Sequence, residues 1–294
     1  MAIGAPQALW ELGATLGEGP VWVGPDAALW FVDIKAPAIH RFDPASGQGR
    51  SWAAPAQAGW VLPDAGGGFV VGLQSGLHRF DPAAHTSTGR FTPLCAPEAA
   101  LPGNRLNDAT VAADGAIWFG SMDDAEQADS GRIYRIDAQG CADTGLPPVC
   151  ITNGPAFSPC GRIMYHHDTL GRRIWASTVE GARITGTCLF AQIEEGAGYP
   201  DGPTVDAEGC LWVGLFAGWG VRRYAPDGRL IATLRFPVAN VTKVAFGGAD
   251  LRTAYATTAT KGLSQADRAS QPLAGALFAF DAGVAGLPAT PARL

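Results

Sequence analysis

A pair of short, strand-like apolar segments recurs six times along this sequence, and the repeat restricts the folds that the chain can adopt. One anchor residue in each copy aligns the repeats, with spacings of 39, 49, 46, 48 and 42 residues. The anchors are Trp30, Phe69, Trp118, Met164, Trp212 and Ala254. Repeats of about 40–50 residues are typical of propeller blades. The sequence therefore predicts an all-β fold: a six-bladed β-propeller with four-stranded antiparallel blades around a central channel, formed by residues 1–294 as a single domain.

Glycine and proline support this interpretation. They account for 39 and 22 of the 294 residues, which suits many short strands joined by turns and disfavours long helices. Turn sequences such as VAADGAIW and VDAEGCLW come just before the anchors and predict a hairpin between the first two strands of a blade. The apolar segment 8–12 is expected to supply an outer strand to the last blade and so close the ring.

Charge, apolar content and cysteine usage exclude several classes of function. Lys+Arg 21 and Asp+Glu 27 give a net charge of −6, which argues against a nucleic-acid partner. No run of about 18 apolar residues could span a membrane, and the first twenty residues lack the pattern of a secretory signal. The 6 cysteines form no C-x-x-C pair, which indicates reduced, mostly buried thiols. We expect a soluble cytoplasmic protein, with a monomer as the default.

Polar residues occupy equivalent positions ahead of five of the six anchors. Counting back 11 residues from the anchors of repeats three to six reaches Asn107, Asn153, Asp201 and Lys243. The turn of the first repeat is one residue longer, and counting back 12 there reaches Glu18. Repeat two offers only Ala58 or Gln57. Because the innermost strand of each propeller blade starts beside the channel, these polar side chains are predicted to converge on one axis.

Carboxylates and amides from separate blades, aimed at one axis, predict a metal site in the channel. Carboxylates brought together repel one another, and a bound cation relieves that repulsion. With Glu18, Asn153 and Asp201 as direct ligands, two negative charges meet one divalent ion and leave coordination positions for water and substrate. The oxygen-rich donor set suits calcium, magnesium or manganese. The alternative is that these are ordinary strand-start residues whose side chains satisfy backbone groups.

At these residues the sequence resembles the regucalcin and gluconolactonase family, most closely its bacterial aldonolactonases. The resemblance covers essentially the whole chain and is carried by LGEGPVW from Leu16, RLNDATVAADGAIWFGSM from Arg105, ITNGPAFSPCGRIMYHHDT from Ile151, YPDGPTVDAEGCLWVG from Tyr199 and KVAFGGADLRTAYATTATKGLS from Lys243. It implies that Glu18, Asn153 and Asp201 are the metal ligands. It further implies that Asp201 doubles as the base and that Arg105 and Asn107 bind substrate. The resemblance also admits zinc and iron(II).

Three further features have alternative roles in the sequence. In the acidic loop 122–131, Asp123 or Asp124 is expected to bind substrate hydroxyls, with Asp124 assigned to this role, and a solvated surface loop is the alternative. Lys243 would either balance the acidic ligands, orient substrate or form a buried ion pair. The His-His-Asp segment 166–168 is interpreted as structural, because neighbouring strand residues point to opposite faces of a sheet.

The resulting hypothesis is a metal-dependent hydrolase that opens sugar-acid lactones, such as xylonolactone, arabinonolactone or gluconolactone, in oxidative sugar catabolism. Its substrate would be a small sugar lactone, with no nucleic-acid or membrane partner. Two alternatives remain at this point. One is a calcium-binding propeller without catalysis, which has no need of Arg105 above the ion. The other is a metal-dependent phosphoesterase on the same scaffold.

Overall fold

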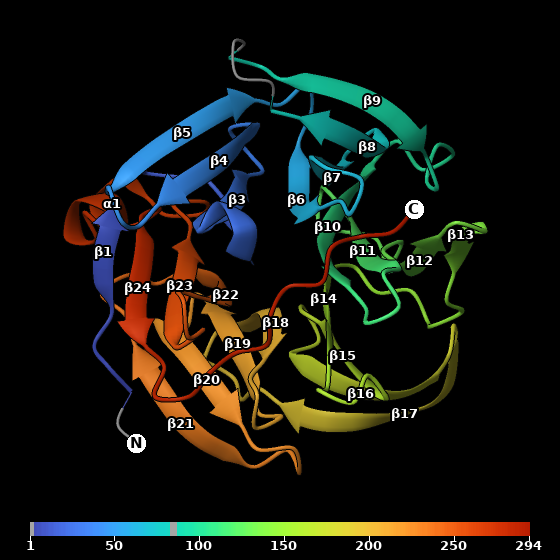
Figure 1. Cartoon of the computed structure of the whole chain (residues 1–294). Coiled ribbons are helices and arrows are strands. Elements are labelled where there is room, and N and C mark those ends of the chain that lie inside the picture. The colour runs from blue at the N-terminus through green and yellow to red at the C-terminus, as the bar shows by residue number, and fades with distance from the viewer. Residues whose placement is uncertain (1–2, 83–86) are drawn as a thin grey trace.

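Six four-stranded antiparallel sheets are arranged around a centre in the computed structural model, which describes residues 3–82 and 87–294 (Figure 1). The first three blades are β2 (Gly17–Val23), β3 (Ala28–Asp33), β4 (Ala38–Asp43) and β5 (Gln48–Ala53); β6 (Ala58–Pro63), β7 (Phe69–Leu73), β8 (Gly76–Asp81) and β9 (Arg90–Cys95); and β10 (Asn104–Val111), β11 (Ile117–Asp123), β12 (Ile133–Asp137) and β13 (Gly140–Asp143).

The next two blades are β14 (Thr152–Phe157), β15 (Ile163–Asp168), β16 (Arg173–Glu180) and β17 (Arg183–Gln192); and β18 (Tyr199–Val205), β19 (Leu211–Phe216), β20 (Gly220–Tyr224) and β21 (Leu230–Arg235). The sixth contains β22 (Val241–Gly247), β23 (Thr253–Thr258), β24 (Leu277–Asp281) and β1 (Gln7–Trp10). A 3-10 turn η1 (Gly24–Asp26) and a short helix α1 (Gln265–Ser270) complete the described elements. The predicted six-bladed propeller is confirmed.

The sixth blade joins the two ends of the chain. β1 pairs antiparallel with β24, with Gln7 opposite Ala279 and Ala8 opposite Phe278. The N-terminal segment therefore provides the outer strand of the last blade, as the sequence predicted, and the ring closes through backbone hydrogen bonds between distant parts of the chain.

Apolar side chains fill the spaces between consecutive blades. Six buried clusters each join one blade to the next around the ring. Trp30 of the first blade, for example, lies 4.1 Å between ring centroids from Phe69 of the second. Trp212 of the fifth blade meets Phe246 of the sixth edge-on at 5.7 Å. The anchor residues therefore belong to the core between the blades. This core is needed because a single blade cannot bury its own faces.

Every innermost strand carries an irregularity near its start. The register shifts between Glu18 and Val21 in β2, and equivalent shifts occur in β6, β10, β14, β18 and β22. Inner strands of neighbouring blades also approach closely at this level. A Cβ added to Gly59 would lie 2.3 Å from the carbonyl oxygen of Leu106, and one added to Gly202 would lie 2.5 Å from Cβ of Lys243. Such irregularities remove residues from the regular strand pairing and change the direction of their side chains.

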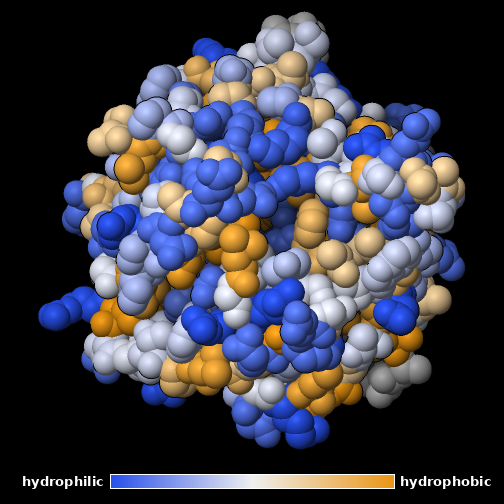
Figure 2. All heavy atoms as spheres, turned by 180° about the vertical axis from the view of Figure 1, so that it is seen from behind, coloured by the Kyte–Doolittle hydropathy of each residue, from blue (hydrophilic) through white to orange (hydrophobic). Residues whose placement is uncertain are grey.

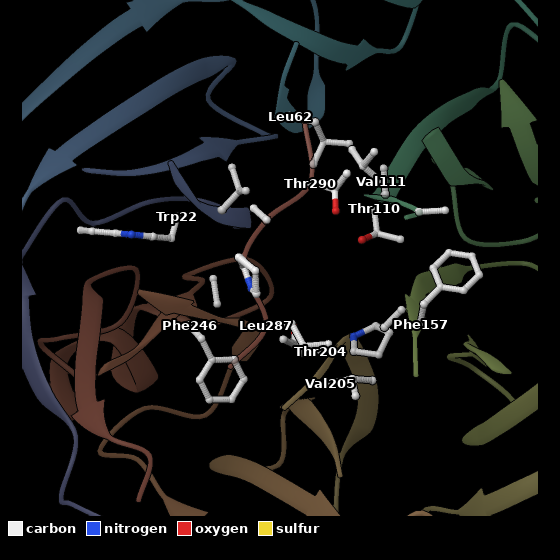
Figure 3. A pocket seen from close by; sticks show the side chains of 18 of the residues that line it. Trp22, Leu62, Thr110, Val111, Phe157, Thr204, Val205, Phe246, Leu287 and Thr290 are labelled. Carbon is white, nitrogen blue, oxygen red and sulfur yellow. The ribbon is translucent and has the colours of Figure 1, made fainter. Parts of the chain in front are cut away.

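The last ten residues, 285–294, form a C-terminal strap across the far ends of the inner strands (Figure 1). The Ala207 N–H donates to Ala285, and Gly286 donates to Leu251, which ties the strap to the fifth and sixth blades. At its other end the strap exchanges hydrogen bonds with the second blade through Ala292, and the Arg293 N–H donates to Gly115 of the third blade. Figure 3 shows Leu287 and Thr290 of the strap beside a cavity of about 330 Å³.

Cysteine burial differs from the sequence expectation. All six cysteines are free, but only Cys150 and Cys210 are buried, while Cys160 and Cys188 are exposed. The expectation of mostly buried thiols is wrong because the other four lie on outer strands or at a turn. Among the described residues, no helix combines the length and apolar character needed to cross a membrane.

Candidate active site at the channel mouth

The irregular starts of the inner strands bring the residues predicted from the sequence register together. Glu18 of β2 and Asp201 of β18 are close enough for each to influence the pKa of the other. Asn107 of β10 donates from Nδ2 to Oδ1 of Asn153 on β14, at 3.3 Å. All four side chains are buried. Figure 2 shows the face of the molecule opposite that of Figure 1, with a hollow near its centre bordered by many hydrophilic residues.

A shared local contact fixes the carboxylates of the site. Each accepts a hydrogen bond from the backbone N–H of the next residue: Glu18 from Gly19 at 2.9 Å and Asp201 from Gly202 at 3.0 Å. Asp108 does the same with the residue that follows it, at 2.8 Å. The strand irregularity makes these N–H groups available, so the same local geometry holds three acids from three blades.

Burial dominates the electrostatics of this cluster. It raises the pKa of Glu18 well above its usual value, and the neighbouring Asp201 and Asp108 add to that effect. Burial likewise raises the pKa of Asp201 to about 7, with a further contribution from Asp108, although the Gly202 N–H opposes the shift. The charged forms of Glu18 and Asp201 are therefore costly here, and a cation between them would offset that cost.

Asp108 is a site residue that the register analysis missed. It is 1% exposed on β10, and its carboxylate bonds to the Lys243 ammonium at 2.5 Å and to the Gly154 N–H at 2.9 Å. Lys243, one of the residues found by register, is thus in a buried ion pair that links the third and sixth blades. The available signal was the position of Asp108 directly after Asn107, within the same irregular stretch.

The orientation of Asn153 is set by a hydrogen-bond chain. Its Nδ2 donates to Thr169 Oγ1 at 3.0 Å, and that hydroxyl donates to the Pro200 carbonyl at 3.1 Å. With the amide nitrogen engaged in this way, Oδ1 of Asn153 is turned toward Asn107. An amide oxygen held in this orientation is a suitable ligand for a hard cation.

Arg105 connects the cluster to the acidic loop. Its Nη1 donates to Oδ1 of Asn107 at 2.6 Å, and its Nε donates to Asp124 at 2.9 Å. Asp124 also accepts from Lys35 at 2.6 Å and from Gln57 at 3.0 Å. The Arg105 side chain is 2% exposed, so its guanidinium is buried although it pairs with a partly exposed carboxylate.

The two adjacent acids of loop 122–131 have different surroundings. Asp123 accepts from the backbone N–H groups of Gln127 and Ala128, both at 2.9 Å, and so shapes the loop itself. Asp124 instead faces Arg105. Farther along, Glu126 forms an ion pair with Lys261. The structure therefore places Asp124, and not Asp123, beside the Arg105 side chain.

The two histidines of the His-His-Asp segment have different surroundings. His166 bonds to Ser177 at 2.9 Å, whereas His167 lies opposite Asn153 in the strand pairing. Within residues 3–82 and 87–294, no group of three or more His, Cys, Asp or Glu side chains could hold a metal ion. A donor set of two carboxylates and an amide from Glu18, Asp201 and Asn153 is of a different kind, and its oxygen atoms and charge suit a divalent cation.

Comparison with known proteins adds family and fold relationships. Residues 16–260 match the family model described as SMP-30/Gluconolactonase/LRE-like region. The chain is 34% identical to a 6-deoxy-6-sulfogluconolactonase of Pseudomonas putida, with 93% of each chain covered. It is also 34% identical to an L-arabinolactonase of Azospirillum brasilense, covering 93% of this chain and 90% of the relative.

The fold has a counterpart among solved structures. A calcium-binding protein, regucalcin from Agrobacterium tumefaciens, superposes with a TM-score of 0.93 at 28% identity, covering 99% of this chain and 98% of that one. The similarity extends over the whole ring and includes the inner strands that carry the candidate site.

Proposed function

The chain belongs to the SMP-30/gluconolactonase/LRE-like family, and we propose that it opens pentono- or hexonolactones to aldonic acids in a metal-dependent reaction. Its enzyme class is that of the lactonases, carboxylic ester hydrolases, since two relatives with lactonase names are 34% identical across most of the chain. Oxidative sugar catabolism is the proposed setting, and the cytoplasm the proposed location.

One observation carries the proposal. Glu18, Asp201 and Asn153 are buried at the starts of the inner strands of three blades, and the buried Arg105 bonds to Asn107, which also contacts Asn153. A purely structural cluster would not need two buried carboxylates that influence each other's pKa. Nor would it need a guanidinium that is buried yet directed at Asn107 and Asp124.

Lactone hydrolysis requires a polarised carbonyl, an activated water and a stabilised oxyanion. A divalent cation held by Glu18, Asn153 and Asp201 would supply Lewis acidity for the carbonyl and acidify a neighbouring water. Asp201 accepts the proton of the attacking water and later returns it to the ring oxygen as the ester bond breaks. Asn107 and Asp124, both bonded to Arg105, bind and orient the sugar hydroxyls. The Arg105 guanidinium also donates hydrogen bonds to these hydroxyls.

The decisive experiment is a metal-dependent lactonase assay. The full chain is stripped with a chelator and assayed on xylono-, arabinono- and gluconolactone after addition of calcium, magnesium, manganese, zinc or iron(II). We expect hydrolysis above the spontaneous rate with at least one ion and loss of that rate after chelation. A rate equal to spontaneous hydrolysis with every ion and every lactone would reject the proposal.

Calcium binding without catalysis is the second candidate, and the structural similarity to a protein described as calcium-binding favours it. The two candidates differ at Arg105, which a storage site for an ion does not use. An Arg105→Lys variant keeps the charge but cannot reproduce the donor geometry to Asn107 and Asp124. Lactonase activity that falls in this variant while calcium affinity stays constant would support the enzyme and exclude the binding protein.

A further inference from the structure

A buried ion pair crosses the channel beside the proposed metal ligands. Lys243 Nζ of the sixth blade lies 2.5 Å from Oδ1 of Asp108 on the third blade, and the two side chains are 8% and 1% exposed. The lysine stem lies against the backbone of Gly202, where an added Cβ would be 2.5 Å from Cβ and Cγ of Lys243. The stem therefore packs on the residue that follows Asp201 before the ammonium reaches Asp108.

The pair is electrostatically part of the site. Asp108 acts on both Glu18 and Asp201, and Lys243 acts on Glu18 in the opposite sense. Breaking a buried pair by removing one partner leaves an uncompensated charge, whereas the pair together is close to neutral. We call the buried group of Glu18, Asp201, Asp108 and Lys243 the hub. Because the hub is buried, its total charge acts on any ion that binds there.

The charge of this hub can be counted from the residues that face one another. Glu18, Asp201 and Asp108 contribute three negative charges and Lys243 contributes one positive charge. Arg105, Lys35 and Asp124 form a separate ion-paired group at the mouth and are not counted in the hub. Glu18, Asp201, Asp108 and Lys243 together carry two negative charges, which matches one divalent cation. Without Lys243 the hub would carry three negative charges, and without Asp108 it would carry one.

We propose that the Lys243–Asp108 pair is a positioning and charge-setting device that fixes the hub at two negative charges and so selects a divalent over a trivalent cation. This inference rests on the proposed metal site. It assigns no contact with the ion to either residue: Asp108 is held by Lys243 and by the Gly154 N–H, and it acts through its charge.

The test measures cation selectivity instead of activity. The chelator-stripped full chain is titrated with Ca²⁺ by calorimetry and with Tb³⁺ by luminescence at pH 7.5, and the ratio of the two Kd values is compared between variants. Lys243→Met should shift the ratio toward Tb³⁺ by about tenfold or more, because one added negative charge favours the trivalent ion more strongly. Asp108→Asn should shift it the other way by a similar factor.

Two matched variants separate charge from packing. The double variant Lys243→Met/Asp108→Asn restores two negative charges and should return the ratio to within about threefold of the wild type. Lys243→Arg keeps the positive charge and should leave the ratio unchanged. A merely structural pair would change the melting temperature of these variants without changing the ratio.

The outcomes distinguish this inference from the function on which it rests. If the wild type binds Ca²⁺ but all variants share its selectivity ratio, the charge-setting role is overturned and the metal site stands. If the wild type binds neither ion, the charge-setting role is overturned, while the lactonase proposal is decided separately by its own assay with all five divalent ions. Should Lys243→Met not fold, the comparison of Asp108→Asn with the double variant decides the matter, because equal ratios in those two variants would overturn the inference.

Discussion

The two carboxylate oxygens of Asp201 have different roles. Its pKa is influenced by a second carboxylate, Glu18, and its own Oδ1 is held by the Gly202 N–H. One carboxylate oxygen thus serves the backbone, while the other is available for chemistry in the channel. An asparagine at this position would keep the shape and the contact with Gly202 but would lose both the charge and the basicity.

We therefore expect Asp201→Asn to lower kcat by at least about 10²-fold through loss of the proton acceptor. Steady-state kinetics with a saturating divalent ion measures this, and circular dichroism confirms the fold. Glu195→Gln is the control, because that acid is exposed in the loop that precedes β18 and should retain wild-type turnover. Near-wild-type kcat in Asp201→Asn would remove the residue from its role as base.

Two buried histidines should make stability fall in mild acid. Burial lowers the pKa of His40 and of His166 to about 4, so both are neutral in the folded protein above that pH. In the unfolded chain they gain protons near pH 6.5, and the stability that they contribute is therefore present above pH 6.5 and lost as pH falls toward 4. At pH 5 the loss is about 2 kcal/mol for each histidine.

The measurement is urea unfolding at pH 7.5 and pH 5, compared between the wild type and a His40→Gln/His166→Gln variant. Carboxylates titrate in both proteins, so the difference between the two pH dependences isolates the histidines. The variant should lose less stability between these pH values than the wild type. Identical losses in both proteins would contradict the assignment.

Single residues also show what the sequence could and could not predict at the site. Glu18, Asn153 and Asp201 are identifiable because a repeat register places them at equivalent positions, and the structure brings them together. Asp108 is not identifiable in this way, because its role depends on a partner 135 positions away. Contacts of that separation are made by ring closure and leave no local pattern.

At the scale of one element, the strand β1 packs on the first blade through a single side chain, besides its backbone pairing with β24. Trp10 extends from the outer edge of the sixth blade onto the first, where its ring lies 5.8 Å from Phe31 and 6.0 Å from Phe42. Gly49 leaves space for this ring, since an added Cβ there would lie 2.5 Å from it. The strand thus closes the ring by hydrogen bonds to β24 and by packing on the neighbouring blade.

Trp10→Ala should lower the free energy of unfolding by about 2–3 kcal/mol, less than the roughly 3–5 kcal/mol typical of a fully buried aromatic residue. Leu9→Ala on the same strand is the matched control. Leu9 is 40% exposed, and its substitution should change stability by no more than about 0.5 kcal/mol. Equal effects of the two substitutions in urea denaturation would argue against closure through Trp10.

The C-terminal strap is an element that the sequence did not predict. Residues 285–294 lack the alternation of a strand, and their hydrogen bonds are with turns and loops of four different blades. The blades themselves were predictable because the anchors repeat with a regular spacing. The strap occurs once, so no repeat marks it, and its place is defined only after the ring has formed.

Deleting residues 285–294 should lower Tm by roughly 5 °C, because several backbone hydrogen bonds between blades are lost. kcat/KM should stay within about twofold of the wild type, since the strap crosses the far ends of the inner strands and the candidate site lies at their starts. Thermal unfolding and lactonase kinetics on the same preparation check both expectations. A large loss of activity with unchanged Tm would show that the strap belongs to the site.

For the whole molecule, the hub is where six blades converge and where like charges are most concentrated. Stabilisation by packing comes from the clusters between the blades. Glu18 and Asp201 oppose it, because burial and mutual repulsion disfavour their charged forms. A ligand that binds only the folded ring shifts the unfolding equilibrium by mass action. Cation binding at the hub should therefore be visible as a change in the stability of the entire propeller.

We expect the chelator-treated protein to melt at a lower temperature than the cation-loaded protein, with about 2.7 kcal/mol of added stability at a free cation concentration of 100 times Kd. Glu18→Gln should weaken this response and should melt at a higher temperature than the wild type when both are free of cation, because a costly buried charge is gone. Asp227→Asn, an exposed change between β20 and β21, should keep the full response. An ion that stabilises Glu18→Gln as much as the wild type binds elsewhere, and the hub would then be a polar core without a metal.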